Sequence, residues 1–192
     1  MDRGAKTRRR IIEAAVALLG REGPDGFSAS AVAREAGVSK ATIFHHFDSL
    51  TEIPEVAVEE IFMASMARSD AAGSDLRSYL SALRDETLEI IHHQPGFINA
   101  YFVFLMKALF DPQLRLRFVA GSMQMLETLY RGLRPRMPEG TSDDDVEEIA
   151  RLLGAALDGV ALHHLVMEDH ERLDAGWERF MDLLDARYGQ QP

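Results

Sequence analysis

The stretch GVSKATIFHHF, residues 37–47, combines a glycine, a helix-capping serine and two adjacent histidines within eleven positions. Gly37 supplies the permissive backbone of a tight turn, and Ser39 is a good N-cap for the residues that follow. We therefore predict a short helix over 40–46 that begins directly after a turn.

A second short helix is predicted immediately before this turn. Ser28 is a good N-cap for the segment ASAVAREA, in which Val32, Ala33 and Ala36 lie on one helical face. The small Ala33 and an apolar Ile43 on the inner face of the next helix allow the two helices to pack closely at a steep angle. Two short helices joined in this way are typical of a helix-turn-helix.

The residues before position 28 predict a third helix with a basic start. Residues 1–50 carry a net charge of +2 and the remainder carries −12, within a total of −10. The positive charge is concentrated in RGAKTRRR, residues 3–10. Because Lys and Arg neutralise phosphates, this division favours contact of the N-terminal part with a polyanion. The apolar residues at helical spacing, which stop at the REGPDG break, are Ile11, Ile12, Ala15, Leu18 and Leu19.

From about residue 10 to residue 47 the chain resembles the DNA-binding domain of the TetR/AcrR family of transcriptional regulators. The matching segments are RIIEAAVALLGREG, SASAVAREAGVS and KATIFHHF. The resemblance implies an all-α homodimer with an N-terminal three-helix helix-turn-helix DNA-binding domain and a C-terminal helical ligand-binding and dimerisation domain, which we place at 1–50 and 51–192. It also implies a repressor that releases double-stranded operator DNA when a small effector binds.

Two positions depart from the family pattern. The family usually has a tyrosine where this chain has Phe44, and the tyrosine hydroxyl commonly contacts a phosphate. It usually has a lysine where this chain has Leu50. Both departures remove a polar anchor to the DNA backbone, which predicts weaker or differently anchored binding by an unchanged fold.

The histidine pair lies at the exposed end of the expected recognition helix. Adjacent side chains on a helix diverge by about 100°, so His45 and His46 are poorly placed to chelate one ion, and polar contact with DNA is the expected role. Helix N-termini favour anions, which adds the two capping serines as phosphate contacts. The DNA-binding candidates are Ser28, Ser39, Lys40, Thr42, His45, His46, Arg8 and Arg9.

The segment FINAYFVFLMKALF, residues 97–110, is apolar almost all round. A helix of this kind is buried or lines a cavity. With nearby methionines it predicts a site for a small hydrophobic or aromatic effector, while plain core packing is the alternative role of each side chain. The ligand-binding candidates are Phe97, Tyr101, Phe104, Met123, Met125 and His164.

The segment 142–170 is predicted as one long helix that is apolar on two faces. One face can pack into the chain's own core and the other against a second subunit, where Gly159 allows two backbones to approach. The segment AGWERFMDLLDARYG, residues 175–189, resembles the last helix of the family, which completes a four-helix dimer interface. The dimer-interface candidates are Leu153, Leu157, Gly159, Val160, Trp177, Phe180 and Leu184.

Other classes of protein find less support in the sequence. His164 and Glu168 have an i, i+4 spacing that can share a metal, so a metal-sensing regulator that uses His163, His164 and Glu168 is one alternative. No further ligand or general base is identifiable, and we expect no metal, no cofactor and no enzymatic activity. A helical interaction protein without DNA binding is the other alternative, motivated by Phe44 and Leu50.

Cellular location is inferred from absent signals. The chain has no cysteine, its basic N-terminus lacks a small-residue cleavage site, and its apolar runs fall short of a membrane span. We therefore expect a cytoplasmic protein without a membrane partner.

Overall fold

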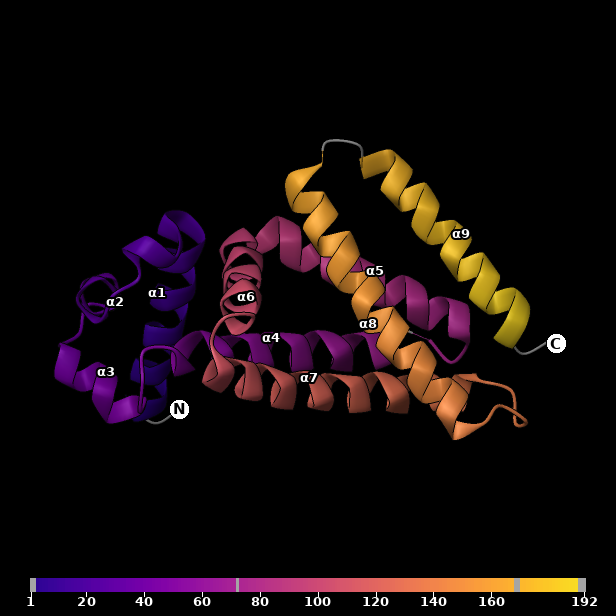
Figure 1. The fold of residues 1–192 in the computed structure, drawn as a ribbon, viewed down its shortest axis with the longest axis horizontal. Coiled ribbons are helices and arrows are strands. Elements are labelled where there is room, and N and C mark those ends of the chain that lie inside the picture. Colours follow the sequence, from indigo (N-terminus) through magenta and orange to yellow (C-terminus); the bar gives the residue numbers. More distant parts are fainter. Residues whose placement is uncertain (1–2, 72, 168–169, 190–192) are drawn as a thin grey trace. The chain divides into compact units, whose positions relative to one another are not determined.

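The structure is a computed structural model that describes residues 3–71, 73–167 and 170–189. All regular elements in these ranges are helical, which confirms the all-α prediction (Figure 1). The α-helices are α1 (Arg3–Gly26), α2 (Ala29–Ala36), α3 (Lys40–His46), α4 (Glu52–Ala71), α5 (Leu76–His93), α6 (Pro95–Ala108), α7 (Pro112–Leu133), α8 (Asp143–Val166) and α9 (His170–Tyr188), with a 3-10 turn at Arg134–Arg136.

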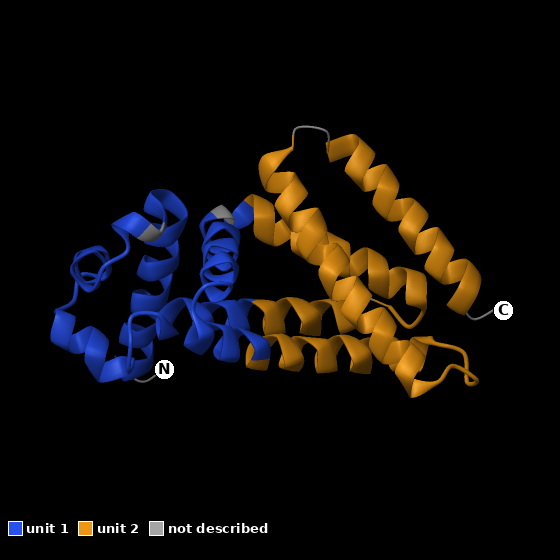
Figure 2. Cartoon of the chain, viewed as in Figure 1, with its two compact units in different colours: residues 1–61, 93–119 blue, residues 62–92, 120–192 orange. Residues whose placement is uncertain are grey.

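The chain forms two compact units that share α4 and α7 (Figure 2). Unit 1 comprises residues 1–61 and 93–119, and unit 2 comprises residues 62–92 and 120–192. These units describe packing, whereas the predicted division at residue 50 concerns function. The functional division therefore stays a prediction.

The core of unit 1 joins α1 to the two short helices. Ile11, Ala15 and Leu18 on α1 are buried against Val32 of α2 and Ile43 of α3, as their helical spacing predicts. The long α1 is interrupted at its C-terminal end, because Gly23 has a φ of 65° and a ψ of −167°. The expected break at REGPDG is thus a local departure from helical geometry within α1.

Helix α1 also packs against α6 at a crossing of two glycines. A Cβ atom on Gly20 would lie 2.0 Å from the Cα of Gly96, so only glycine permits this approach. The Asn99 side-chain amide donates to the Gly20 carbonyl at 3.4 Å, and Leu19 packs beside Phe104. The crossing brings the apolar α6 into direct contact with the helix that supports the helix-turn-helix.

Helix α4 begins with a cap that tolerates an early proline. The amide of Glu52 donates to Ser49 Oγ at 3.2 Å, and the Glu52 carboxylate accepts from the Asp48 amide at 2.6 Å. Pro54 falls in the first turn, where a backbone N–H would have no partner within the helix. The proline is therefore compatible with a helix that starts at Glu52.

Unit 2 is braced by a buried arginine. The guanidinium of Arg136 donates to the carbonyls of Gly73, Gly132 and Asp70 at 2.5–3.1 Å, and to the Asp70 carboxylate at 2.8 Å. It also lies 4.6 Å from the ring centroid of Tyr79, and burial raises the pKa of Tyr79 to about 12. This one side chain ties the α4–α5 turn to the end of α7.

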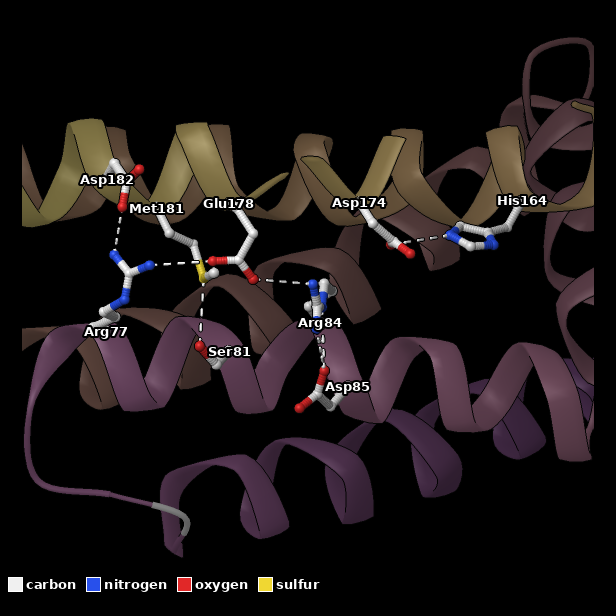
Figure 3. A network of polar contacts seen from close by, with 9 residues as sticks. All are labelled: Arg77, Ser81, Arg84, Asp85, His164, Asp174, Glu178, Met181 and Asp182. Carbon is white, nitrogen blue, oxygen red and sulfur yellow. Dashed lines mark hydrogen bonds and ion pairs between the residues drawn. The ribbon is translucent and has the colours of Figure 1, made fainter. Parts of the chain in front are cut away.

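Polar side chains join α9 to α5 on the surface of unit 2 (Figure 3). Arg77 of α5 pairs with Asp182 at 2.6 Å and with Glu178 at 3.1 Å. Arg84 reaches the other oxygen of Glu178 at 3.2 Å. These pairs fix which face of α9 meets the core, where Trp177 and Met181 are buried.

Helix α8 has the two apolar faces that the sequence predicts, but it is shorter than expected. It ends at Val166, and His170 opens α9, so the prediction of one helix through His170 was wrong. By length and by a mean hydropathy of 1.3 over 18 residues it could cross a membrane, contrary to the expectation from apolar runs. A core helix meets the same criterion, and the inner face of α8 packs into unit 2, so no membrane assignment follows.

Candidate functional site

In the helix-turn-helix, the starts of α2 and α3 and the end of α2 are capped. Ser28 Oγ accepts from the Ala31 amide at 3.2 Å, and Ser39 Oγ accepts from the Thr42 amide at 3.0 Å, as both predicted N-caps require. Gly37 has a φ of 62° and a ψ of 41°, a left-handed conformation that favours glycine. Its amide donates to the Arg34 carbonyl at 3.2 Å, which ends α2 and turns the chain toward α3.

Arg10 adds a support for the turn that the sequence reasoning missed. Its Nη2 donates to the Ala36 carbonyl at 2.5 Å and to the Gly37 carbonyl at 3.5 Å. A cation at a helix C-terminus meets the negative end of the helix dipole. The only signal in the sequence was the basic run at residues 8–10, which does not reveal which arginine turns inward.

Helix α3 has one buried face and one exposed face. Ile43 is fully buried, and Phe47 at the end of α3 is 2% exposed. Lys40, Phe44 and His45 are exposed on the opposite side, and Lys40 makes no hydrogen bond or ion pair with the described residues. The exposed face therefore offers an uncommitted cation beside polar and aromatic side chains, which suits contact with a duplex.

The remaining candidates on α3 are partly engaged with one another. Thr42 Oγ1 lies 2.8 Å from Ser39 Oγ, and the rings of His45 and His46 meet edge to face at 5.3 Å between centroids. His46 is half-buried. The structure thus brings five of the predicted DNA-binding residues together at α3, while Ser28 lies at the start of α2.

The two arginine candidates on α1 are already paired with carboxylates. Arg8 lies 3.1 Å from Glu60 of α4 and 5.0 Å from the ring centroid of Phe47, and Arg9 lies 3.1 Å from Glu13. Phosphate contact by either arginine would compete with these exposed pairs. Leu50, at one of the two departures from the family pattern, packs against the core of unit 1.

The ligand-binding candidates divide between the two units. In unit 1, Phe97, Tyr101 and Phe104 are buried on α6. In unit 2, Met125 is half-buried and Met123 is exposed. Met123, Glu147 and Ala150 belong to the lining of a shallow hollow of about 80 Å³ between α7 and α8. That the ligand-binding candidates of the two units act together in effector binding stays a prediction.

His164 is the most unusual polar side chain of unit 2. It is only 4% exposed, and neither ring nitrogen has a hydrogen-bond partner among the described residues. A carboxylate oxygen of Asp174 lies 3.7 Å from Nε2 (Figure 3), and the ring centroids of His170 and His92 lie at 4.4 and 6.5 Å from that of His164. Burial, followed by the charge of His170, lowers the pKa of His164. Buried unsatisfied nitrogens are costly, so this ring is suited to meet a polar ligand or water.

The metal-sensing alternative gains no support from the geometry. Helix α8 ends before position 168, so the helix does not hold the i, i+4 spacing of His164 and Glu168, and Glu168 lies outside the described residues. His163 is exposed. Within residues 3–71, 73–167 and 170–189, no group of three potential ligands is arranged to hold a metal ion.

The dimer-interface candidates fall mostly on the inner face of α8 and α9. Leu153, Leu157, Val160 and Trp177 are buried in unit 2's own core, and Phe180 and Leu184 are half-buried against it. Gly159 differs, because a Cβ atom there would meet nothing within 4 Å. The outer face of α8 carries the exposed side chains Leu152, Leu162 and Val166, which are 59%, 43% and 69% exposed.

The geometry agrees with comparisons to known proteins. Residues 11–53 match the family model for bacterial regulatory proteins of the tetR family. The HTH-type transcriptional regulator CymR of Pseudomonas putida is 26% identical over 195 residues, which cover 98% of this chain and 94% of that protein. The HTH-type transcriptional regulator BetI of Rhizobium meliloti is 27% identical over 184 residues, which cover 93% of this chain and 88% of that protein.

The fold is also shared with a solved regulator. A transcriptional regulator of Saccharomonospora viridis, solved in complex with choline, has a TM-score of 0.73 and 23% identity, with 97% of this chain and 100% of that chain covered. The curated relatives are named as transcriptional regulators and not as enzymes. From the matched segment and the capped helix-turn-helix, it follows that residues 11–53 form a DNA-binding domain of the tetR family of bacterial regulatory proteins, and the chain is similar to HTH-type transcriptional regulators along nearly its whole length.

Proposed function

We propose that this cytoplasmic regulator is a homodimeric repressor that binds a pseudo-palindromic operator and releases it when a small apolar or aromatic effector binds. The observation that carries the proposal is the exposed face of α3, where Lys40 has no partner among the described residues. The caps at Ser28 and Ser39 and the brace from Arg10 hold this face in a fixed orientation. A preorganised reading helix is what sequence-specific contact in the major groove requires.

The proposed reading residues are tested by operator binding. Genomic fragments selected by the purified protein supply the operator. Lys40→Ala and Thr42→Ala should each weaken specific binding by about 1–3 kcal/mol and relax discrimination, because base contacts carry specificity. Arg9→Ala should weaken binding to all sequences nearly alike and flatten the salt dependence.

A matched control for Arg9 exists in unit 2. Arg131 forms an exposed i, i+4 pair with Glu127 at 2.9 Å, as Arg9 does with Glu13. Arg131→Ala should leave the salt dependence unchanged. Unaltered discrimination by both the Lys40 and the Thr42 variants would remove these residues from the readout.

We propose that the outer face of α8 contacts a second copy of this chain. The exposed apolar side chains Leu152, Leu162 and Val166 lie on the face that also contains Gly159, and a dimer would cover them. A palindromic operator requires two heads, which supports a second copy as the occupant. The inner-face candidates Leu153 and Leu157 would then support the interface through the core.

Sedimentation tests this assignment. Leu162→Glu should produce a folded monomer with at least tenfold weaker operator binding, because a single head makes half of the contacts. Leu116→Glu is the control, since Leu116 is 73% exposed on α7, outside the proposed interface. An intact dimer in the Leu162 variant would place the interface elsewhere.

We propose that the effector contacts Phe97, Tyr101, Phe104, Met123, Met125 and His164. The choline complex of the regulator with the same fold supports a small molecule in the helical body. The two unsatisfied nitrogens of His164 favour an apolar effector that also carries a polar group. The glycine crossing of α1 and α6 is suited to transmit a shift of α6 to the head.

Linkage provides the test of the effector. A coupling of about 1–3 kcal/mol would loosen operator binding about 5- to 150-fold, and operator DNA would weaken effector binding by the same factor. Hydrophobic compounds that raise the melting temperature are titrated with and without operator. His164→Asn should weaken the binding of such a compound, and His163→Gln, at an exposed position, should not. Equal affinity with and without DNA would mean that the compound is not the signal.

A further inference from the structure

Phe44 is the large apolar side chain on the exposed face of α3. It is 51% exposed, although the neighbouring Ile43 is fully buried. It makes no ring-stacking or cation–π contact with the described residues. About half of its surface is therefore left uncovered by the residues that the structure describes.

The position of Phe44 places it beside the uncommitted cation of the reading face. Lys40 and Phe44 are four residues apart, so their side chains lie on the same side of α3, and His45 is exposed next to them. If Lys40 approaches phosphates or base edges in the major groove of DNA, the phenyl ring of Phe44 enters that groove as well. The charge of the neighbouring lysine thus argues for DNA as the occupant of this apolar surface.

The chemistry of the ring selects what it can contact. A phenyl group has no donor or acceptor, so it cannot bond to a phosphate or to the polar edge of a base. Among the groups that the four base pairs display in the major groove, the C5-methyl of thymine is the apolar one, and phenylalanine is among the side chains that contact it. An apolar contact there would distinguish thymine from the other bases.

We propose that Phe44 is a specificity-determining residue that recognises the C5-methyl group of a thymine in each operator half-site. The inference rests on the operator binding proposed above and adds a base preference at one position. Burial of one methyl group contributes about 0.8 kcal/mol, which corresponds to about fourfold in affinity.

The experiment removes single methyl groups from the operator. Each thymine of the selected operator is replaced in turn by deoxyuridine, which keeps the base pair and loses only the methyl group. For the unmodified protein we expect one position in each half-site where the replacement weakens binding about fourfold. Phe44→Ala should bind the operator with thymine at that position and the operator with deoxyuridine there equally well.

Two variants separate a base contact from a general effect. Phe110→Ala removes another exposed phenylalanine of unit 1, at 85% exposure, and should keep the full methyl dependence. Phe44→Leu retains an apolar side chain and should keep part of it. Equal melting temperatures would show that Phe44→Ala folds normally, as its exposure predicts.

Several outcomes would overturn the proposal. It fails if no thymine shows methyl dependence with the unmodified protein, or if Phe44→Ala retains the same dependence. A uniform loss of affinity for every operator in Phe44→Ala would assign the ring to backbone packing instead. Failure of the unmodified protein to bind any selected operator would overturn operator binding itself, and with it this inference.

Discussion

The two compact units satisfy their backbone polar groups in different ways. In the helix-turn-helix of unit 1, the capping partners of Ser28 and Ser39 lie three residues away in the sequence. In unit 2, Arg136 donates to the carbonyls of Asp70 and Gly73, which lie 66 and 63 residues away. The caps of the reading element are therefore local, although Arg10 reaches the Ala36 carbonyl from 26 residues away, whereas the brace of unit 2 joins segments more than 60 residues apart.

The units also differ in what they leave incomplete. Buried side-chain atoms without a hydrogen-bond partner occur, within the described ranges, on Glu55 of unit 1 and on His164 and Trp177 of unit 2. Both units expose large apolar side chains, among them Leu152 and Val166 on α8 of unit 2 and Phe110 and Leu116 in unit 1. The buried ring of His164 and the exposed outer face of α8 are the features of unit 2 that a ligand and a second subunit would complete.

The largest expected effect tests the long-range brace of unit 2. Arg136→Met keeps most of the apolar stem but leaves the buried Gly132 carbonyl and the part-buried carbonyls of Gly73 and Asp70 without this donor, which should lower the free energy of unfolding by about 3 kcal/mol. Chemical denaturation measures it. Arg134→Met is the control, because Arg134 pairs with the exposed Asp143, and this substitution should cost less than about 1 kcal/mol. Equal losses in the two variants would contradict the proposed importance of the brace.

The next effect asks whether unit 1 depends on a long-range contact as well. Gly20→Ala forces a Cβ against the backbone of Gly96 and should lower the free energy of unfolding by about 2 kcal/mol. Gly121→Ala in α7 meets nothing within 4 Å and should raise it by about 0.5–1 kcal/mol. Denaturation curves that show no loss for Gly20→Ala would mean that α1 and α6 separate easily.

A smaller effect compares local caps in the two units. Ser39→Ala should cost about 1 kcal/mol and Ser39→Gly only a few tenths, because glycine is a tolerated N-cap. Ser142 caps α8 through the Asp145 amide at 3.1 Å, so Ser142→Ala should cost the same in unit 2. A much larger loss at one cap would show that it has a role beyond its helix. DNA binding by Ser39→Gly then tests, separately from stability, whether the hydroxyl contacts a phosphate.

The smallest effect is a pH dependence that arises in unit 2. The pKa of His164 in the folded protein lies below the usual 6.5, because burial and the nearby His170 and His92 disfavour the charged ring, while Asp174 opposes them. At a pH between the lowered pKa of His164 in the folded protein and the usual pKa of 6.5 in the unfolded chain, the unfolded chain binds a proton that the folded chain does not. The free energy of unfolding should therefore fall as the pH is lowered through this window.

Melting curves at several pH values check this dependence. His164→Asn should flatten it, and His163→Gln, at the adjacent exposed position, should not. An unchanged pH profile in the His164 variant would assign the titration to another group.

Much of the fold is predictable from local signals in the sequence. The bounds of α2 and α3, the left-handed Gly37 and both serine caps follow from residue types a few positions apart. The two faces of α8 follow from helical periodicity. For the candidate site, periodicity also identifies the exposed residues of α3, because Ile43 and Phe47 mark its inner face.

Contacts between distant segments could not be predicted in the same way. Nothing in the sequence distinguishes Arg136, which is buried, from Arg134, or Arg10, which braces the turn, from Arg9. Likewise, the meeting of Gly20 with Gly96 requires knowledge of which helices cross. The dimer-interface candidates on the inner face of α8 are apolar, and apolarity alone does not distinguish a residue of the core from one that contacts a second subunit.

The pairing of arginines on α1 has a consequence for how this protein finds its operator. Arg8 and Arg9 face Glu60 and Glu13, and Arg10 is bound to backbone carbonyls, so each of these three cations must give up its present partner before it can replace counterions on arbitrary DNA. Residues 51–192 carry a net charge of −12, which opposes prolonged residence on a polyanion. This exchange of partners by the three arginines reduces the gain in free energy from each phosphate contact, so we expect a smaller dependence of nonspecific affinity on ionic strength than the number of cations in the head implies, and shorter one-dimensional sliding along DNA.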